Sequence, residues 1–227
     1  MSSTWTMRIV FGLFLALLLF WFLPNESSPR PELWDMKLES GKLSIMGLTL
    51  NESALKDATA TLNTKPETAF FTTRQREGEP VPPMHLESYY KELFNEDDNI
   101  IIGLHSNDDL LHRIKKRAYQ PKLFPNDTIR TSITDEMMQA IPELAIRSIT
   151  IVVGDRIDSK VFDERFGAPT QIIDDGDGNA HFLHPELGLD FIQPSEGRQV
   201  LQFVSPELFE AELLLPLMKS RKEGYHK

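Results

Sequence analysis

The stretch from Asp158 to Ser205 constrains the fold most, because one helix pattern and four strand patterns follow one another within it. Asp158 is a favourable N-cap residue. Gly167 and Pro169 form a typical helix ending, since glycine adopts the left-handed conformation and proline keeps the helix from resuming. Strands are expected at 170–173, 180–184, 188–193 and 199–204, separated by residues that favour turns. The stretch therefore predicts a short helix followed by an antiparallel meander.

The first half of the chain shows a similar order of patterns. We expect a strand at 42–50, a helix from Ser53 to a cap at Asn63, strands at 67–73, 84–94 and 99–104, and a helix that opens at Ser106. Asn63 would take the place of Gly167, because asparagine also tolerates the left-handed conformation. Ser106 followed by Asp109 is a capping-box pattern. The two halves are thus interpreted as similar units, and a single α+β domain is the alternative.

The predicted fold class is α+β, with an N-terminal transmembrane helix followed by two similar units of short helices packed on antiparallel β-meanders. The expected division is an anchor at 1–24, a spacer at 25–39, a first unit at 40–118, a connector at 119–145, a second unit at 146–219 and a tail at 220–227. Within the connector, Thr134 is expected to cap a short helix. Ser205 and Pro206 are expected to start a last helix that Pro216 ends, because proline disrupts a helix interior.

An almost unbroken apolar run occupies residues 9–23, with Arg8 before it and Pro24 after it. No small-residue cleavage pattern follows, and Trp5 and Trp21 would lie about 24 Å apart in a helix, as aromatic residues at the two membrane interfaces do. We therefore expect an uncleaved, single-pass anchor in a bacterial inner membrane. A cleaved signal peptide and a buried helix are the alternatives. Arg8 and the amino terminus favour a cytoplasmic N-terminus, with the body in the periplasm.

The charge and the absence of cysteine exclude several classes of function. The chain carries a formal net charge of −10, and the part after the apolar run carries −11, since it holds all 34 acidic residues and 23 of the 24 basic ones. This balance argues against nucleic-acid binding, which needs a basic surface. With no cysteine, the chain has no disulfide, thiolate metal ligand, cysteine nucleophile or lipid-modified cysteine.

A family resemblance rests on Phe-Gly-Ala-Pro at 166–169, His-Pro-Glu-Leu-Gly-Leu-Asp-Phe at 184–191 and Val-Leu-Gln-Phe at 200–203. This order resembles the small α/β repeat of outer-membrane-assembly lipoproteins (SmpA/OmlA-like) and of β-lactamase-inhibitor-protein-like domains. The resemblance covers residues 148–204 well and 45–104 by architecture only. It implies helices packed on one sheet face, and an envelope protein that works by binding another protein. The chain departs from the pattern in lacking a lipobox and in having His184 where an aromatic residue is usual.

Acidic residues of the second unit have the spacing of a calcium loop. Asp175, Asp177, Asn179 and Glu186 match positions 1, 3, 5 and 12 of such a loop. Ala180, however, stands where that loop needs glycine, and the flanking segments are expected to be strands. A hairpin turn is therefore the favoured interpretation, and a weak calcium site is the alternative.

Two further patterns could carry chemistry. Ser53 and Lys56 match the Ser-x-x-Lys motif of penicillin-binding proteins, but the companion motifs are missing and a helix N-cap explains Ser53. His181 and His184 stand three apart on an expected strand, so they would face opposite sides and could not bind one metal ion. We expect His181 at the surface and His184 beside a turn.

A group of basic residues ends the helix after Ser106: Arg113, Lys115, Lys116 and Arg117. Cations stabilise a helix C-terminus, which is the favoured interpretation; a patch for lipid headgroups or an acidic partner is the alternative. No catalytic residue, cofactor site or metal site is predicted. The predicted function is a membrane-anchored, non-catalytic envelope protein whose exported body binds a protein partner of unknown identity. The alternative is an enzyme, or an enzyme accessory, acting on cell-wall or envelope substrates.

Overall fold

The structure, a computed structural model, describes residues 35–75, 82–91, 93 and 97–224, with side chains up to 219. All of these residues belong to one unit, which spans 31–227. The expected anchor at 1–24 and most of the expected spacer lie outside the described residues. Within the described part of the chain, no helix is long and apolar enough to cross a bilayer.

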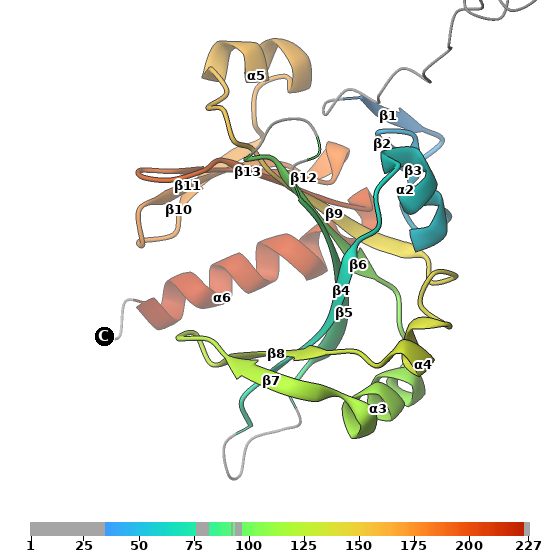
Figure 1. Ribbon diagram of the computed structural model, residues 1–227. Coiled ribbons are helices and arrows are strands. Elements are labelled where there is room, and N and C mark those ends of the chain that lie inside the picture. Colours follow the sequence, from blue (N-terminus) through green and yellow to red (C-terminus); the bar gives the residue numbers. More distant parts are fainter. Residues whose placement is uncertain (1–34, 76–81, 92, 94–96, 225–227) are drawn as a thin grey trace, which may run out of the picture. The chain divides into compact units, whose positions relative to one another are not determined.

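A ten-stranded sheet, antiparallel throughout, forms the centre of the unit (Figure 1). Its strands are β4 (Glu67–Thr73), β5 (Met84–Lys91), β6 (Asn99–Leu104), β7 (Tyr119–Leu123), β8 (Thr128–Ser132), β9 (Ile146–Val152), β10 (Gln171–Asp174), β11 (Asn179–His184), β12 (Leu189–Pro194) and β13 (Val200–Val204). The spatial order is β10-β11-β12-β13-β9-β6-β5-β4-β8-β7. The sheet bends strongly, so that it has a concave and a convex face (Figure 1). The predicted α+β class, with mostly antiparallel strands, is confirmed.

Two meanders approach the middle of this sheet from opposite sides. Strands β4, β5 and β6 follow one another inward, β10 to β13 do the same from the other edge, and β9 lies between β6 and β13. A short helix precedes each meander: α2 (Leu55–Leu62) before β4, and α5 (Ser159–Phe166) before β10. Both meanders therefore belong to a single continuous sheet.

The main hydrophobic core lies on the convex face. Covering that face are α2, α3 (Asp108–Arg117), α4 (Asp135–Met138) and α5, together with a small sheet of β1 (Met36–Glu39), β2 (Lys42–Ile45) and β3 (Leu48–Thr49) (Figure 1). Buried residues of this core include Leu43, Ile45, Leu55, Ile100, Ile102, Leu110, Leu111, Ile114, Ile149, Ile151, Phe162 and Phe191. Phe162 of α5 stacks on Phe191 of β12, with ring centroids 4.1 Å apart, and so fixes α5 on the sheet.

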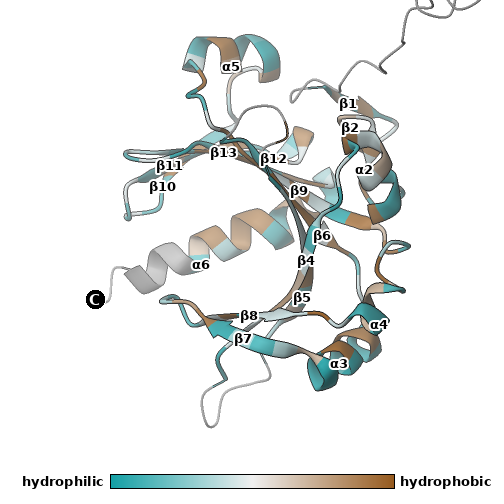
Figure 2. Cartoon of the chain, in the orientation of Figure 1, coloured by the Kyte–Doolittle hydropathy of each residue, from teal (hydrophilic) through white to brown (hydrophobic). Residues whose placement is uncertain are grey.

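The chain crosses to the concave face after β13. A 3₁₀ turn (Pro206–Leu208) and a π-helical segment (Glu210–Leu214) lead into α6 (Leu215–Gly224), and Figure 2 shows apolar residues along the first part of this region. Phe209 and Leu217 are buried there with Ile173, Leu183 and Val204 in a second, smaller core.

Pro216 does not end this helix, which continues to Gly224, so the prediction that the last helix stops at Pro216 is wrong. Proline clashes with the carbonyl four residues earlier in a regular α-helix. Here the preceding turn is a π-helix, in which the N–H of Leu215 bonds five residues back to Glu210, and this wider turn accommodates the ring.

Two of the predicted helix caps are displaced by one residue. Helix α2 is capped at Ala54, whose N–H donates to Asp57, whereas the Ser53 hydroxyl accepts the N–H of Thr49 at 2.9 Å. Helix α3 is capped by Asn107 rather than Ser106, because the Asn107 side chain accepts the N–H of Leu110 at 2.8 Å. The expected strand at 42–50 is also interrupted, since Met46 and Gly47 form a tight turn with φ of 54° and 78°.

The predicted ends of α2 and α5 are correct in position. Asn63 caps α2 with φ 49° and ψ 35°, in the left-handed region. Gly167 caps α5 with the expected positive φ of 79°, but its ψ of 178° is extended rather than left-handed. That combination is essentially restricted to glycine, so the requirement for glycine is stronger than predicted.

Candidate functional site

The two meanders differ in what covers their concave side. The π-helical segment and α6 pack on β10, β11 and β13 through the smaller core. Helix α3, which follows the first meander, instead buries Leu110, Leu111 and Ile114 in the core of the convex face. The concave side of β4, β5 and β8 therefore carries exposed side chains, among them Lys91 at 65% and Glu67 at 55% of full exposure.

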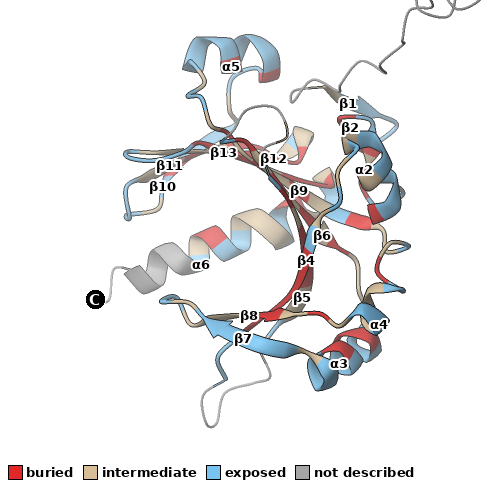
Figure 3. Cartoon of the chain, in the orientation of Figure 1, coloured by how far each residue is buried: buried red, intermediate tan, exposed pale blue. Residues whose placement is uncertain are grey.

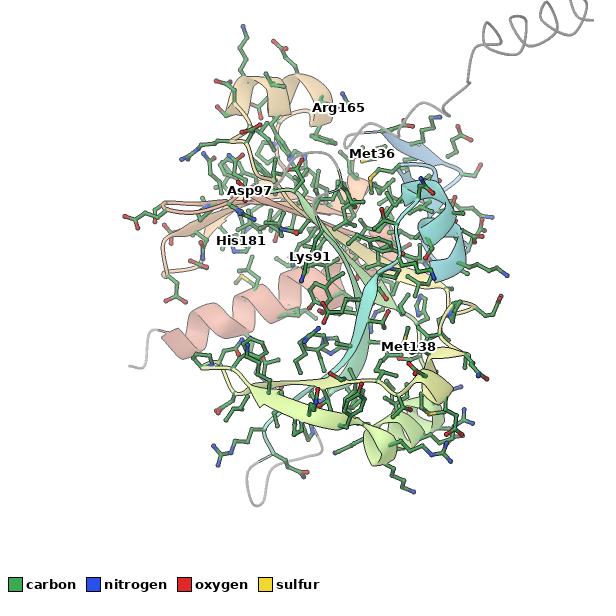
Figure 4. The ribbon with its side chains drawn as sticks, in the orientation of Figure 1. Met36, Lys91, Asp97, Met138, Arg165 and His181 are labelled. Carbon is green, nitrogen blue, oxygen red and sulfur yellow. The ribbon has the colours of Figure 1, made fainter. Side chains whose placement is uncertain are left out.

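Strand β5 supplies most of the functional groups on this side. Leu86, Ser88 and Tyr90 point into the convex core and are fully buried. Because side chains alternate along a strand, His85, Glu87, Tyr89 and Lys91 point to the concave side, where Figure 4 shows Lys91. The sequence analysis missed this group, although the alternation within 84–91 was a signal that could have found it.

Glu87 is the centre of a hydrogen-bonded group. His85 Nε2 lies 3.1 Å from Glu87 Oε1, and the Tyr89 hydroxyl donates to Glu87 Oε2. Burial opposes ionisation of Glu87, but the hydrogen bonds from His85 and Tyr89 together outweigh it and lower the pKa of this carboxyl. Burial and the hydrogen bond to Glu87 raise the pKa of Tyr89, so the phenol stays a donor.

Aromatic and charged neighbours extend this group across β4 and β8. Phe71 stacks on His85, with centroids 5.5 Å apart and an interplanar angle of 12°. Arg130 donates to Glu67, and this hydrogen bond is the main cause of the lowered pKa of Glu67. Lys91 Nζ lies 3.5 Å from the same carboxylate. We call the following seven residues the open face: Glu67, Phe71, His85, Glu87, Tyr89, Lys91 and Arg130.

A second polar cluster is buried and joins β11, β12 and the turn after β10. His181 Nδ1 lies 2.7 Å from Asp190 Oδ2, and His181 Nε2 lies 3.7 Å from Asp175 Oδ2. His181 and Asp190 are only 8% and 3% exposed, and the second oxygen of Asp190 has no partner among the described residues. Burial alone would lower the pKa of His181, but the two carboxylates, Asp190 foremost, raise it.

The two histidines face opposite sides of β11, as predicted, and His184 directly precedes the 3₁₀ turn after this strand, also as predicted, but the expected surface position of His181 is wrong. His181, labelled in Figure 4, is buried rather than at the surface, because Asp190 of the neighbouring strand provides an ionic partner. His184 is also buried, with its ring centroid 5.5 Å from that of Phe162, and burial lowers its pKa. The contact with Asp190 depends on strand register, which sequence periodicity alone does not fix.

The acidic turn after β10 is organised by its own backbone. Asp175 Oδ1 accepts the N–H groups of Asp177 at 2.8 Å and Asn179 at 3.1 Å, and Oδ2 accepts the Asn179 side-chain amide at 2.6 Å. Glu186 lies in a 3₁₀ turn after β11. Among the described residues, no group of three or more His, Asp or Glu side chains is placed to hold a metal ion. This geometry supports the hairpin interpretation.

The other two sequence patterns lie on the surface. Lys56 Nζ pairs with Glu143 at 2.5 Å. The Ser53 hydroxyl accepts the N–H of Thr49 in the turn before α2, so both side chains have structural partners. On α3, Arg117 pairs with Glu136 of α4.

A shallow hollow of about 520 Å³ also lies along α3, lined by Asn107, Asp109, His112, Arg113 and Lys116.

Comparisons of this chain with protein-family models, with curated proteins and with solved structures find no match. The open face is therefore interpreted from its own geometry. It combines an ionised carboxylate, a tyrosine, a histidine and two cations with a buried aromatic ring, on a rigid sheet.

Proposed function

We propose that this chain is a membrane-anchored, non-catalytic protein of the bacterial envelope, whose body lies in the periplasm and binds a protein partner. The observation that carries the proposal is the open face, which α6 leaves uncovered while it packs on the other meander. In this proposal the two meanders are similar units, as in the α/β repeats that the sequence resembles, and a partner occupies the side that lacks a trailing helix.

The chemistry of the open face favours protein recognition. Tyrosine and arginine are enriched among residues that dominate binding energy at interfaces, and the open face holds Tyr89 and Arg130. Their hydrogen bonds to Glu87 and Glu67 fix both side chains before a partner arrives. Such pre-organisation lowers the entropy that binding would otherwise cost.

Site-specific photo-crosslinking in the producing cells tests this proposal. A photo-reactive amino acid at position 91 of the full chain should give a discrete adduct with another protein, because Lys91 lies on the open face. The matched control is position 160, an exposed lysine on α5 with 83% of its side chain accessible. Equal adducts at both positions, or adducts at 160 alone, would contradict the proposal.

One observation favours the alternative of an enzyme acting on cell-wall or envelope substrates. Glu87 lies between His85 and Tyr89, and these are residue types that serve as general acids and bases. Glu87→Gln separates the two functions, because the amide keeps the size of the side chain and loses its charge. Turnover of purified envelope material by the wild type that is lost in this variant would favour the enzyme.

A further inference from the structure

The two edges of the ten-stranded sheet are protected to different degrees. At one edge, β7 contains Pro121 and Lys122, and its register with β8 shifts between Tyr119 and Lys122. Proline, lysine and irregular register are devices that keep an edge strand from pairing further. At the other edge, β10 has none of these, although the strand is largely exposed (Figure 3). Three of its four residues are exposed, and Ile172 is 59% exposed.

The ladder between β10 and β11 determines which backbone groups point outward. The N–H of Asp175 donates to the carbonyl of Asn179 at 3.1 Å, and the register continues from Asp174 opposite Ala180 to Ile172 opposite Phe182. Hydrogen-bonded and non-bonded pairs alternate in an antiparallel ladder. Ile173 therefore bonds inward to β11, while the N–H and C=O groups of Ile172 and Asp174 point away from the sheet.

The charge near this edge indicates what kind of strand could pair with it. Asp174 ends β10, and Asp177 follows in the turn; both are exposed. A second copy of the chain would bring together two bodies that each carry a net charge of −11, since all 34 acidic and 23 of the 24 basic residues follow the apolar run. A segment with basic residues would instead be attracted.

We propose that the outer edge of β10 accepts an extended, basic segment of another protein by β-strand addition. Main-chain hydrogen bonds from Ile172 and Asp174 hold the segment. An aliphatic residue of the segment packs beside the exposed Ile172 side chain, and a lysine or arginine lies near Asp174. This surface is separate from the open face, so the inference does not depend on the function proposed for that face.

Fluorescence anisotropy with the full chain in detergent micelles tests the inference. The probes are short labelled peptides: alternating valine and lysine, alternating valine and glutamate, and the lysine peptide with every second amide N-methylated. The unmodified lysine peptide should bind. N-methylation should weaken binding about tenfold or more, because the charge remains while edge hydrogen bonds are lost, and the glutamate peptide should not bind.

Variants locate the binding surface. Ile172→Pro removes an outward N–H without removing an inward ladder bond. It should weaken binding of the lysine peptide about as much as N-methylation of the peptide does. The control is Leu123→Lys on β7, where an apolar side chain of similar exposure, 51%, is replaced at the other edge; it should leave binding unchanged. If Ile172→Pro does not fold, the N-methylated peptide decides the question alone.

Three results would overturn the inference. Equal binding of the N-methylated and unmodified peptides would mean that charge, not strand addition, holds the probe. Wild-type affinity in a folded Ile172→Pro variant would place the probe elsewhere. A concentration-dependent dimer that disappears in Ile172→Pro would make a second copy of the chain the occupant of this edge.

Discussion

Substitution of Gly167 measures how strongly the end of α5 is specified. Gly167 has φ 79° and ψ 178°, and no heavy atom of the described chain beyond its immediate neighbours lies within 4 Å of where a Cβ would stand. A larger residue would therefore meet backbone strain rather than a steric clash with a neighbour. Residues other than glycine cost about 1–3 kcal/mol in such sparsely populated regions. Gly167→Ala should fall in this range, and Gly167→Val at its upper end, because a β-branched side chain is most restricted.

Urea denaturation of the body, residues 31–227, gives the free energy of unfolding for each variant. Asn63→Gly is the matched control, because Asn63 caps α2 at φ 49° and ψ 35°, a conformation that glycine adopts at least as readily. It should be neutral or slightly stabilising. If Gly167→Val leaves the free energy of unfolding unchanged, α5 does not end in this conformation, and the resemblance built on Phe166 to Pro169 loses its main support.

Three further predictions follow from the second polar cluster, the acidic turn and the N-terminal run. The folded state raises the pKa of His181 above 6.5, so its contribution to stability should be fully present below pH 6.5 and lost as the pH rises through the raised value; melting temperature against pH should show this loss, and His181→Gln should abolish it. Millimolar calcium should barely change the melting temperature, since hydrogen bonds already occupy the Asp175 carboxylate; a large rise that Asp177→Ala removes would reveal a metal loop. A reporter fused after Lys227 should be active only outside the cytoplasm, and a functional cytoplasmic reporter there would exclude the proposed topology.

Local patterns predicted the second half of the body well. Asp158 caps α5 by accepting the N–H of Lys160 at 2.8 Å, and β10 to β13 lie close to the expected ranges. These features depend on residues close together in sequence, such as caps and turn formers. The helix caps that were displaced, at Ala54 and Asn107, stand among several adjacent polar residues, any of which could have served.

The candidate site was harder to predict because its contacts join distant parts of the chain. Arg130 reaches Glu67 across a separation of 63 residues, and Phe71 meets His85 only because β4 and β5 pair in one particular register. Periodicity indicates which side chains share a face of one strand, but not which strands become neighbours. His85, Glu87 and Tyr89 are the exception, since one strand carries all three.

The different positions of the two trailing helices follow from their apolar patterns. Helix α3 has a single apolar stripe, Leu110, Leu111 and Ile114, and its remaining surface is polar. Contact with the convex core along this one side therefore buries all of its apolar residues. The segment from Leu208 to Met218 carries apolar residues on several sides. It lies between the arms of the curved sheet (Figure 1) and buries Phe209 and Leu217 against the second meander, while Leu215 stays 56% exposed. Because the smaller core fixes this segment on β10, β11 and β13, and the stripe of α3 is buried in the convex core, neither helix covers the polar and aromatic groups that β4, β5 and β8 display on the open face.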